Sequence, residues 1–190
     1  MSLSSGWSFP SQSGNWLGKD TLLTPPYRGL PMMETFSGTP GTRWRFFTDA
    51  VMGGVSSGRV EFVSDSARVH ARMTGKVSIA NNGGFIQIRM DLPAQPPADI
   101  EGVRLVVRGN RQRYFVHLRN AATRLPWQYY QAGFEVGTEW NEVHLPLASF
   151  MASGSMPGAI ATAESLRSIG IVAYGRDHEA EIEIREVAFY

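Results

Sequence analysis

The chain has 190 residues, 43% hydrophobic and 18% charged, so it is long enough for one domain with a substantial core and too apolar to be disordered. Its 18 Lys and Arg and 17 Asp and Glu leave a formal net charge of +1, which argues against a general attraction to nucleic acid or anionic membranes. The absence of cysteine excludes disulfides, thiolate catalysis and cysteine-ligated metals.

Residues 1–34 are rich in Ser, Gly and Pro, and prolines at 25, 26 and 31 oppose both helix and central strand. Because several aromatic residues lie among them, we predict an irregular arm that packs on the domain formed by residues 35–190. The N-terminus lacks the pattern of a signal peptide, and no apolar run reaches the roughly 20 residues that span a bilayer. We therefore expect no integral membrane segment and a cytoplasmic location.

From residue 43 onward, hydrophobic and polar residues alternate with a period of two, which is typical of strands with one buried and one solvated face. Turn-forming Gly, Asn, Asp and Pro residues separate these segments, and only residues 159–168 favour a short helix. The sequence predicts an all-β antiparallel sandwich of about nine strands with little helix. The predicted strands include residues 44–48, 59–62, 68–73, 85–90, 103–108, 114–119, 142–145 and 181–185.

Residues 54–58, Gly-Val-Ser-Ser-Gly, satisfy the G-x-S-x-G pattern of a hydrolase nucleophile elbow. An elbow needs a strand before the serine and a helix after it. Residues 44–48 supply the strand, but residues 59–62 alternate as a second strand. We therefore interpret the match at Ser56 as coincidental and predict no catalytic residue.

A structural turn explains the same stretch better. Gly53 and Gly54 permit a sharp turn, and the side chains of Asp49 and Ser56 can cap backbone groups. The turn would close one end of the sandwich, with three apolar side chains acting as plugs: Val51, Met52 and Val55.

This stretch also resembles the signature of the complex I intermediate-associated protein 30 family, a Trp followed by Asp-x-Val-Met-Gly-Gly-Val-Ser. The corresponding residues are Trp44 and residues 49–56, so the signature loop includes Asp49, Met52, Gly53, Gly54 and Ser56. Further blocks resemble the family in the same order, and the resemblance covers residues 36–189. These blocks are residues 83–89, 99–120, 127–150 and 165–189.

The resemblance implies a jelly roll of the galactose-binding-domain type, similar to carbohydrate-binding modules. The characterised eukaryotic members are mitochondrial chaperones for the assembly of respiratory complex I, and no catalytic residues are established for the family. It thus implies a non-enzymatic module that binds a protein partner, such as subunits of a respiratory complex. The alternative is a module that binds a carbohydrate or another small ligand on a concave sheet face.

The outward faces of the middle strands combine arginine, amide and aromatic groups, which suit sugars, carboxylates or a peptide. The candidate binding residues are Gln87, Arg89, Phe115, His117, Arg119, Gln128 and Tyr130, with Phe85 and Arg113 on the same faces. The alternative is a solvated face whose arginines pair with acids at 135, 142, 181 and 183. Tryptophans 44, 127 and 140 are expected to pack in the core or at corners.

The remaining residue patterns predict neither a metal nor a cofactor. The four histidines, at 70, 117, 144 and 178, lack the spacing of a zinc site. A carboxylate pair for glycoside hydrolysis stays open, because strand pairing could bring two acids together. Glu181 and Glu183 share a face, but we expect them to pair with arginines.

Overall fold

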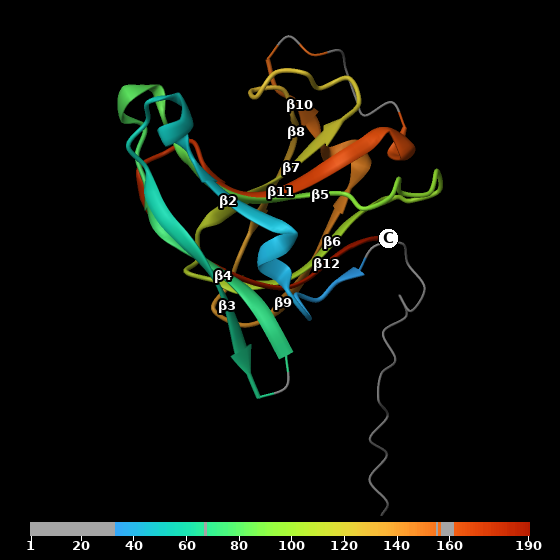
Figure 1. Ribbon diagram of the computed structural model, residues 1–190, viewed down its shortest axis with the longest axis horizontal. Helices are drawn as coiled ribbons and strands as arrows, with labels where there is room; N and C mark the ends of the chain where they lie inside the picture. The colour runs from blue at the N-terminus through green and yellow to red at the C-terminus, as the bar shows by residue number, and fades with distance from the viewer. Residues whose placement is uncertain (1–32, 67, 155, 157–161) are drawn as a thin grey trace, which may run out of the picture.

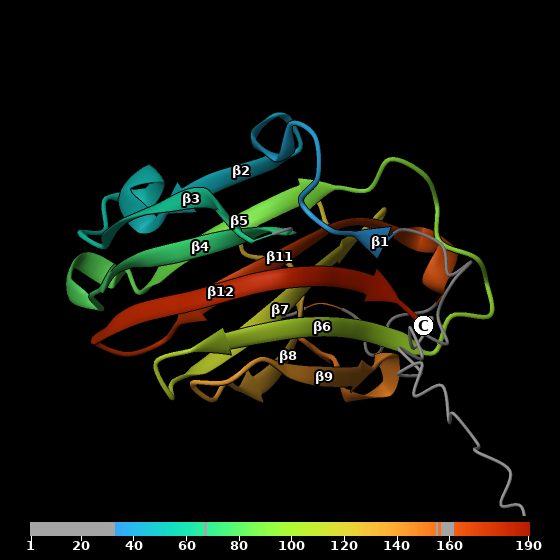
Figure 2. The same ribbon diagram turned by 90° about the horizontal axis from the view of Figure 1, so that it is seen from below.

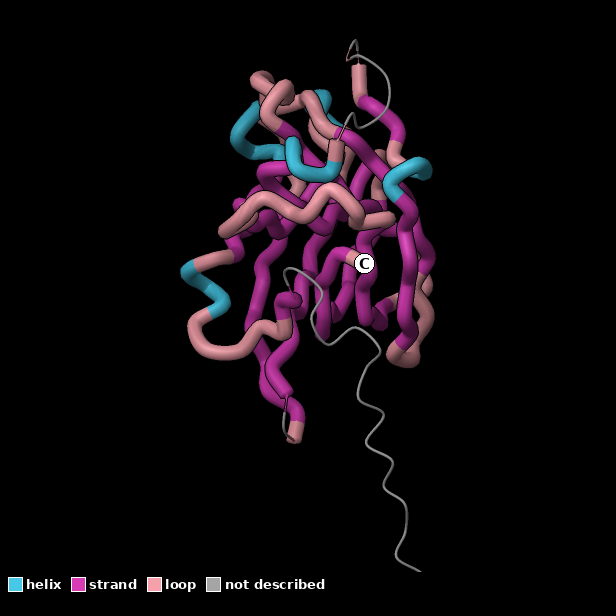
Figure 3. Tube along the Cα trace, turned by 90° about the vertical axis from the view of Figure 1, so that its right-hand side faces the viewer, coloured by secondary structure: helices cyan, strands magenta, loops and turns pink. Residues whose placement is uncertain are grey.

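The structure, a computed structural model, describes residues 33–66, 68–154, 156 and 162–190. Two antiparallel sheets pack face to face and appear as an upper and a lower layer in Figure 1. Strands dominate the described chain, and its helices are short single turns (Figure 3). The predicted all-β antiparallel sandwich is therefore confirmed.

Sheet A has the strand order β3-β4-β12-β6-β9, which Figure 2 shows from one side. A short strand, β1, pairs with the end of β12. The bounds are β1 Met33–Glu34, β3 Ser57–Asp65, β4 Arg68–Val77, β6 Gly102–Gly109, β9 Asn141–Pro146 and β12 His178–Phe189.

Sheet B has the strand order β10-β8-β7-β11-β5-β2. Its bounds are β2 Trp44–Thr48, β5 Phe85–Asp91, β7 Arg113–Asn120, β8 Tyr130–Glu135, β10 Met151–Ala152 and β11 Leu166–Tyr174. The 3-10 turns are η1 Pro40–Thr42, η2 Asp49–Met52, η3 Ala80–Asn82, η4 Leu147–Ser149 and η5 Ala163–Ser165.

The core lies between the two sheets and follows the predicted alternation. On β5 and β7 alternate side chains are buried, and on β6 and β12 the same pattern supplies the opposite wall. The remaining side chains of β5 and β7 therefore point away from the core, onto the outer face of sheet B. The buried sets include Ile86 and Ile88, Tyr114, Val116 and Leu118, Val103, Leu105 and Val107, and Ile182 and Ile184.

The helix expected over residues 159–168 is wrong where the structure describes it. Residues 157–161 lie outside the described chain, η5 covers only Ala163–Ser165, and Leu166 already begins β11. A bulge between Leu166 and Ser168 shifts the register against β7, so Leu166 and Ile169 both face the core. This irregular spacing obscures the period of two in the sequence.

Most of the predicted N-terminal arm lies outside the described residues, but its end is anchored by Glu34 in β1. The Glu34 carboxylate accepts hydrogen bonds from Arg43 Nε at 2.9 Å, from the indole of Trp44 at 3.1 Å and from the backbone N–H of Phe36. Burial alone would raise the pKa of Glu34, but these donors hold it below its usual value. Glu34 thus joins β1 to the start of β2.

Candidate binding groove on sheet B

The register of sheet B aligns its outward side chains in rows that cross five strands. One row runs from β2 to β8 through Phe47, Gln87, Val172, Phe115 and Gly133. The neighbouring row consists of Arg45, Arg89, Gly170, His117 and Gln131. Gly170 leaves the middle of its row without a side chain, so the sheet is hollowed there.

Two loops rise beside these rows and turn the sheet face into a cavity of about 450 Å³, here named the central groove. Val51 and Met52 of the signature loop form one rim, and Pro126 and Trp127 of the loop before β8 form another. The volume lies within the roughly 300–1,000 Å³ of small-ligand sites. The floor and walls include Phe47, Gln87, Arg89, His117, Arg119, Tyr129, Gly170, Val172 and Tyr174.

An aromatic stack forms one wall of the central groove. The rings of His117 and Tyr129 are parallel within 9°, with centroids 3.9 Å apart, and Tyr174 meets His117 edge-on at 6.0 Å. The Tyr129 and Tyr174 hydroxyls are hydrogen-bonded, and burial together with this bond raises the pKa of Tyr129. His117 Nε2 lies 2.8 Å from Gln131 Oε1, so the ring N–H donates a hydrogen bond to the amide oxygen. Burial lowers the pKa of His117 to about 4, which leaves the imidazole neutral at pH 7.

Arg89 is a partly buried cation in the groove. Its guanidinium lies over the ring of Phe47 at 4.8 Å, and within the described residues its buried Nε has no hydrogen-bond partner. Burial lowers the pKa of Arg89, and the nearby cations Arg119 and Arg45 lower it further, against the opposing effect of Asp91. Arg45 is engaged elsewhere, because it forms an ion pair with Asp91 at 2.5 Å. The site therefore holds a cation that an acceptor-rich ligand would satisfy.

The structure brings four predicted binding residues together in the central groove and separates the other three. Gln87, Arg89, His117 and Arg119 all line it. Phe115 lies in an adjoining hollow, where its ring meets Tyr174 edge-on at 6.1 Å.

Gln128 and Tyr130 do not line the groove. Gln128 Oε1 accepts from the backbone N–H groups of Arg124 and Leu125, so this side chain orders its own loop. The outward placement of Tyr130 is wrong, because Tyr130 is buried among core residues. In β8 the core positions are Tyr130, Ala132 and Phe134, and Tyr129 is the neighbour that faces the groove. A one-residue shift in register exchanges the two faces of a strand.

The three tryptophans have different surroundings. Trp44 is buried in the core as expected. Trp140 lies against the guanidinium groups of Arg185 and Arg108, at 4.0 and 4.6 Å. The expectation for Trp127 is wrong, since its side chain is 59% exposed on the rim of the central groove. Because it lies in a loop, no periodicity in the sequence predicts its exposure.

The signature loop is organised around Asp49, whose side chain is completely buried. Its carboxylate accepts hydrogen bonds from Ser56 N–H at 2.9 Å, Ser56 Oγ–H at 2.5 Å and Gly84 N–H at 2.5 Å. Burial alone would raise the pKa of Asp49, but these donors and Phe85 N–H hold it below its usual value. A Cβ at Gly54 or Gly83 would overlap this carboxylate, which explains why the loop needs glycine there.

Other expectations for the loop are confirmed in part. Gly53 has a φ of 87° and ends η2 in the left-handed conformation, as glycine permits. The apolar residues are not plugs, however, because Val51, Met52 and Val55 are 74, 52 and 54% exposed. The buried Asp49 closes this end of the sandwich instead, and the apolar side chains are left to face outward.

Ser56 lacks the surroundings of a nucleophile. Its hydroxyl donates to Asp49 and accepts from Ser78 N–H at 2.9 Å, and the residue is 5% exposed. Strand β3 begins at Ser57, so a strand and not a helix follows the serine. The hydroxyl is used to join the signature loop to the segment after β4.

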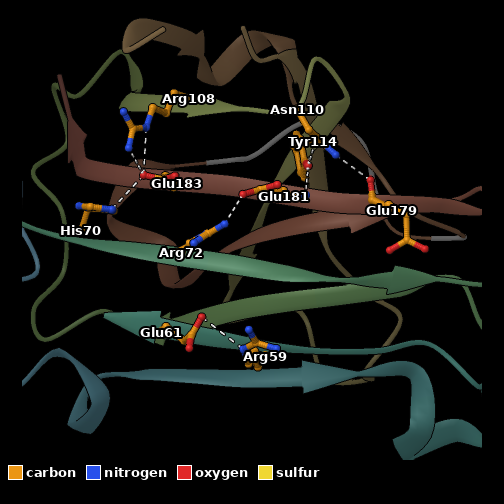
Figure 4. Close-up of polar contacts among 10 residues, drawn as sticks. All are labelled: Arg59, Glu61, His70, Arg72, Arg108, Asn110, Tyr114, Glu179, Glu181 and Glu183. Carbon is orange, nitrogen blue, oxygen red and sulfur yellow. Dashed lines mark hydrogen bonds and ion pairs between the residues drawn. The ribbon is translucent and has the colours of Figure 1, made fainter. Parts of the chain in front are cut away.

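Three of the four acids expected to pair with the arginines of sheet B lie on the other sheet. On the outer face of sheet A, Glu181 pairs with Arg72 and Glu183 pairs with Arg108 and His70 (Figure 4). Glu142 pairs with Arg104 of the same sheet. The expected pairing of Glu181 and Glu183 with arginines is confirmed, but Glu142, Glu181 and Glu183 do not pair with the arginines of sheet B. Of the four expected acids, Glu135 alone lies beside a sheet B arginine, 3.8 Å from Arg113, and on the same sheet Asp91 pairs with Arg45.

The described residues contain neither a metal-binding cluster nor a membrane-spanning helix. No cluster of three His, Asp or Glu side chains in this part of the chain is arranged to hold a metal ion. No helix in it is long and apolar enough to cross a membrane.

Several solved structures with the same fold are carbohydrate-binding modules. A family 11 module of a cellulosomal cellulase of Clostridium thermocellum matches with a TM-score of 0.66 and 11% identity, over 84% of this chain and 94% of that one. The Clostridium thermocellum family 11 module in complex with a β-1,3-1,4-mixed-linked tetrasaccharide has a TM-score of 0.64 and 11% identity, over 82% and 92%. A family 30 carbohydrate-binding module has a TM-score of 0.50 and 11% identity, over 72% and 92%. The chain thus has the galactose-binding-like β-sandwich fold that the family resemblance implies.

No curated protein sequence matches the chain significantly. The sequence profile of the complex I intermediate-associated protein 30 family matches residues 35–184, which include the signature loop and nearly all of both sheets. The chain therefore belongs to the complex I intermediate-associated protein 30 family.

Proposed function

We propose that this protein is a non-enzymatic binding module that holds a partner protein in the central groove, in the manner of an assembly factor. The observation that carries the proposal is the composition of the rim. Trp127, Met52 and Val51 are 59, 52 and 74% exposed beside a groove that contains Arg89. Exposed apolar side chains that are grouped around a cavity mark interaction sites, and Trp and Arg are enriched among residues that dominate binding energy.

The family supports a protein as the occupant, because its name describes association with an intermediate of complex I. The aliphatic rim supports it as well, since Val51 and Met52 offer no hydrogen bonds to a sugar hydroxyl and suit the side chains of a peptide. Catalysis is not part of the proposal, because the hydroxyl of Ser56 is committed to Asp49 and Ser78.

Affinity purification with a matched pair of variants tests this function. Trp127→Ala removes the exposed ring of the rim, and Arg59→Gln removes an exposed arginine on sheet A, 3.2 Å from Glu61. The wild-type protein and Arg59→Gln should recover the same partner, with subunits of respiratory complexes sought first, whereas Trp127→Ala should lose it. Recovery of no stable partner, or of the same partner by all three proteins, would contradict the proposal.

A carbohydrate ligand is the second candidate, and the aromatic wall favours it. The flat pair of His117 and Tyr129 lies beside the amide of Gln87, and planar rings next to fixed polar groups are suited to sugar faces. The modules of the same fold described above bind carbohydrate, as the bound tetrasaccharide of one shows. A glycan array and a thermal-shift panel of sugars that both show no binding would remove this candidate.

A further inference from the structure

The central groove continues at both ends along strands β7 and β11. Beyond Tyr174 lies a hollow lined by Arg111, Arg113 and Arg176. At the opposite end, a hollow shares Arg89 and Arg119 with the central groove and adds Arg167. The outer face of sheet B therefore carries one elongated depression with an aromatic middle and two basic ends.

Positive charge is concentrated in this depression although the whole chain is nearly neutral. Six arginines line the three hollows, against the two carboxylates of Asp91 and Glu135. Asp91 is already paired with Arg45, and Glu135 is 72% exposed and lies 3.8 Å from Arg113. The middle adds no charge at pH 7, because burial lowers the pKa of His117 to about 4. Arg119, Arg167 and Arg176 donate hydrogen bonds to backbone or amide oxygens, which carry no charge. Most of the arginine charge at the two ends is thus not neutralised by a carboxylate and is left for a ligand.

The chemistry of these ends selects an acceptor-rich ligand. A guanidinium offers five N–H donors in a planar fork and no acceptor, which matches a carboxylate. Arg89 adds a buried Nε that has no hydrogen-bond partner in the described part of the chain. Among the described residues that line the central groove, none is Asp or Glu, so no side-chain carboxylate competes there with the ligand.

The spacing of the two ends sets the length of the ligand. Arg113 and Arg119 lie on the same outward face of β7, six residues apart. At about 3.3 Å per residue in a strand, this separation is about 20 Å. An extended peptide covers the same distance with about six residues.

We propose that the depression binds an extended acidic segment of the partner protein, with carboxylates at both ends and an aromatic or aliphatic side chain between them. The central side chain lies between Trp127 and Met52, and the terminal carboxylates lie against Arg89 and Arg119 at one end and against Arg113 at the other. This inference rests on the proposed function, since it names the chemistry of the segment that the groove holds.

Three fluorescein-labelled hexapeptides test the inference by fluorescence polarisation. Each has a central Leu-Trp pair and two Glu, two Gln or two Lys at each end. We expect the Glu peptide to bind at least tenfold more tightly than the Gln peptide, the Lys peptide not to bind, and added NaCl to weaken the Glu peptide selectively.

Variants assign the acid preference to the two ends. Arg89→Gln and Arg113→Gln should each reduce the affinity of the Glu peptide at least tenfold and leave that of the Gln peptide unchanged. Arg113 is 58% exposed, so its variant remains informative even if Arg89→Gln fails to fold. Arg59→Gln on sheet A is the matched control and should change neither affinity.

The outcomes separate this inference from the proposed function. If the Glu and Gln peptides bind equally and Trp127→Ala abolishes both, the acid preference is wrong and the groove still binds peptides. If no peptide binds, but an oligogalacturonate or an eight-nucleotide thymidine strand binds and Arg89→Gln weakens it, the occupant is an anionic polymer of another class, and both proposals are overturned. Absence of binding by every probe overturns both as well.

Discussion

His117 and Tyr129 lie face to face with 3.9 Å between their ring centroids, and burial in this wall keeps the histidine neutral at the centre of the groove. In the unfolded chain the same imidazole has a pKa near 6.5, whereas burial lowers it to about 4 in the folded protein. Between these values the unfolded state binds more protons, so the free energy of unfolding must fall as the pH falls.

The first prediction concerns this pH dependence. The difference between the two pKa values corresponds to at most about 3 kcal/mol, which is lost between pH 6.5 and pH 4. Because His117→Gln has no titrating ring, its stability should change less over this window. Urea unfolding of both proteins at pH 7, 5.5 and 4.5 measures the difference, and parallel pH profiles would show that His117 is not held neutral.

The second prediction concerns the glycines around Asp49. A Cβ at Gly54 would overlap the Asp49 carboxylate, so Gly54→Ala should lower the free energy of unfolding by about 2 kcal/mol or more. Gly41 is the control, because a Cβ there would meet only Phe62, at an ordinary 3.6 Å. Gly41→Ala should therefore change stability by less than about 1 kcal/mol. Equal effects of the two substitutions in chemical denaturation would contradict the account of the loop.

The third prediction concerns Glu34, which receives hydrogen bonds from Arg43 and Trp44. Glu34→Gln should lower the free energy of unfolding by about 1–3 kcal/mol, because the charge-assisted hydrogen bonds to this carboxylate are weakened. Since the pKa of Glu34 is lowered on folding, its contribution is present above pH 4.5 and is lost as the pH falls through its folded value. Glu61→Gln, at a 46% exposed surface ion pair, should leave urea unfolding nearly unchanged.

The fourth prediction separates two tryptophans. Trp44→Ala should destabilise the fold by about 3–5 kcal/mol, because it empties a buried core position. Trp127→Ala should leave the free energy of unfolding within about 0.5 kcal/mol of the wild-type value, because its ring is 59% exposed. If Trp127→Ala unfolded the protein, partner binding would be lost through unfolding, and the variant would no longer test the groove.

The fifth prediction concerns Ser56. A fluorophosphonate probe should not label the folded protein at this residue, because the hydroxyl is hydrogen-bonded to Asp49 and is 5% exposed. Mass spectrometry of the probe-treated protein, compared with Ser56→Ala, measures the labelling. Rapid stoichiometric modification of Ser56 would revive the hydrolase interpretation of the G-x-S-x-G pattern.

The regular strands could be predicted from the sequence because apolar and polar residues alternate between the buried and the solvated face of each strand. Ile86 and Ile88 alternate with Gln87 and Arg89, and the structure places the two pairs on opposite faces of β5. A period of two needs no knowledge of which strands are neighbours. For this reason four groove residues were correctly placed together.

The errors lie where position depends on register or on a loop. Tyr129 and Tyr130 are adjacent aromatic residues at the start of β8, and the sequence does not determine which of the two faces the core. Trp127 precedes the strand, so no alternation applies to it. The pairing of Glu181 with Arg72 joins β12 to β4, and only the strand order reveals that this acid is far from Arg89.

The protein is nearly neutral overall, but its charge is distributed unevenly between the two sheets, so its electrostatic potential is more positive over sheet B. Acids and arginines are paired across the outer face of sheet A, whereas arginines exceed acids along the depression of sheet B. The molecule should therefore adsorb to a cation-exchange resin by one face despite a formal net charge of +1. An acidic partner would approach along the same direction, so the first encounter would already be oriented before any contact forms.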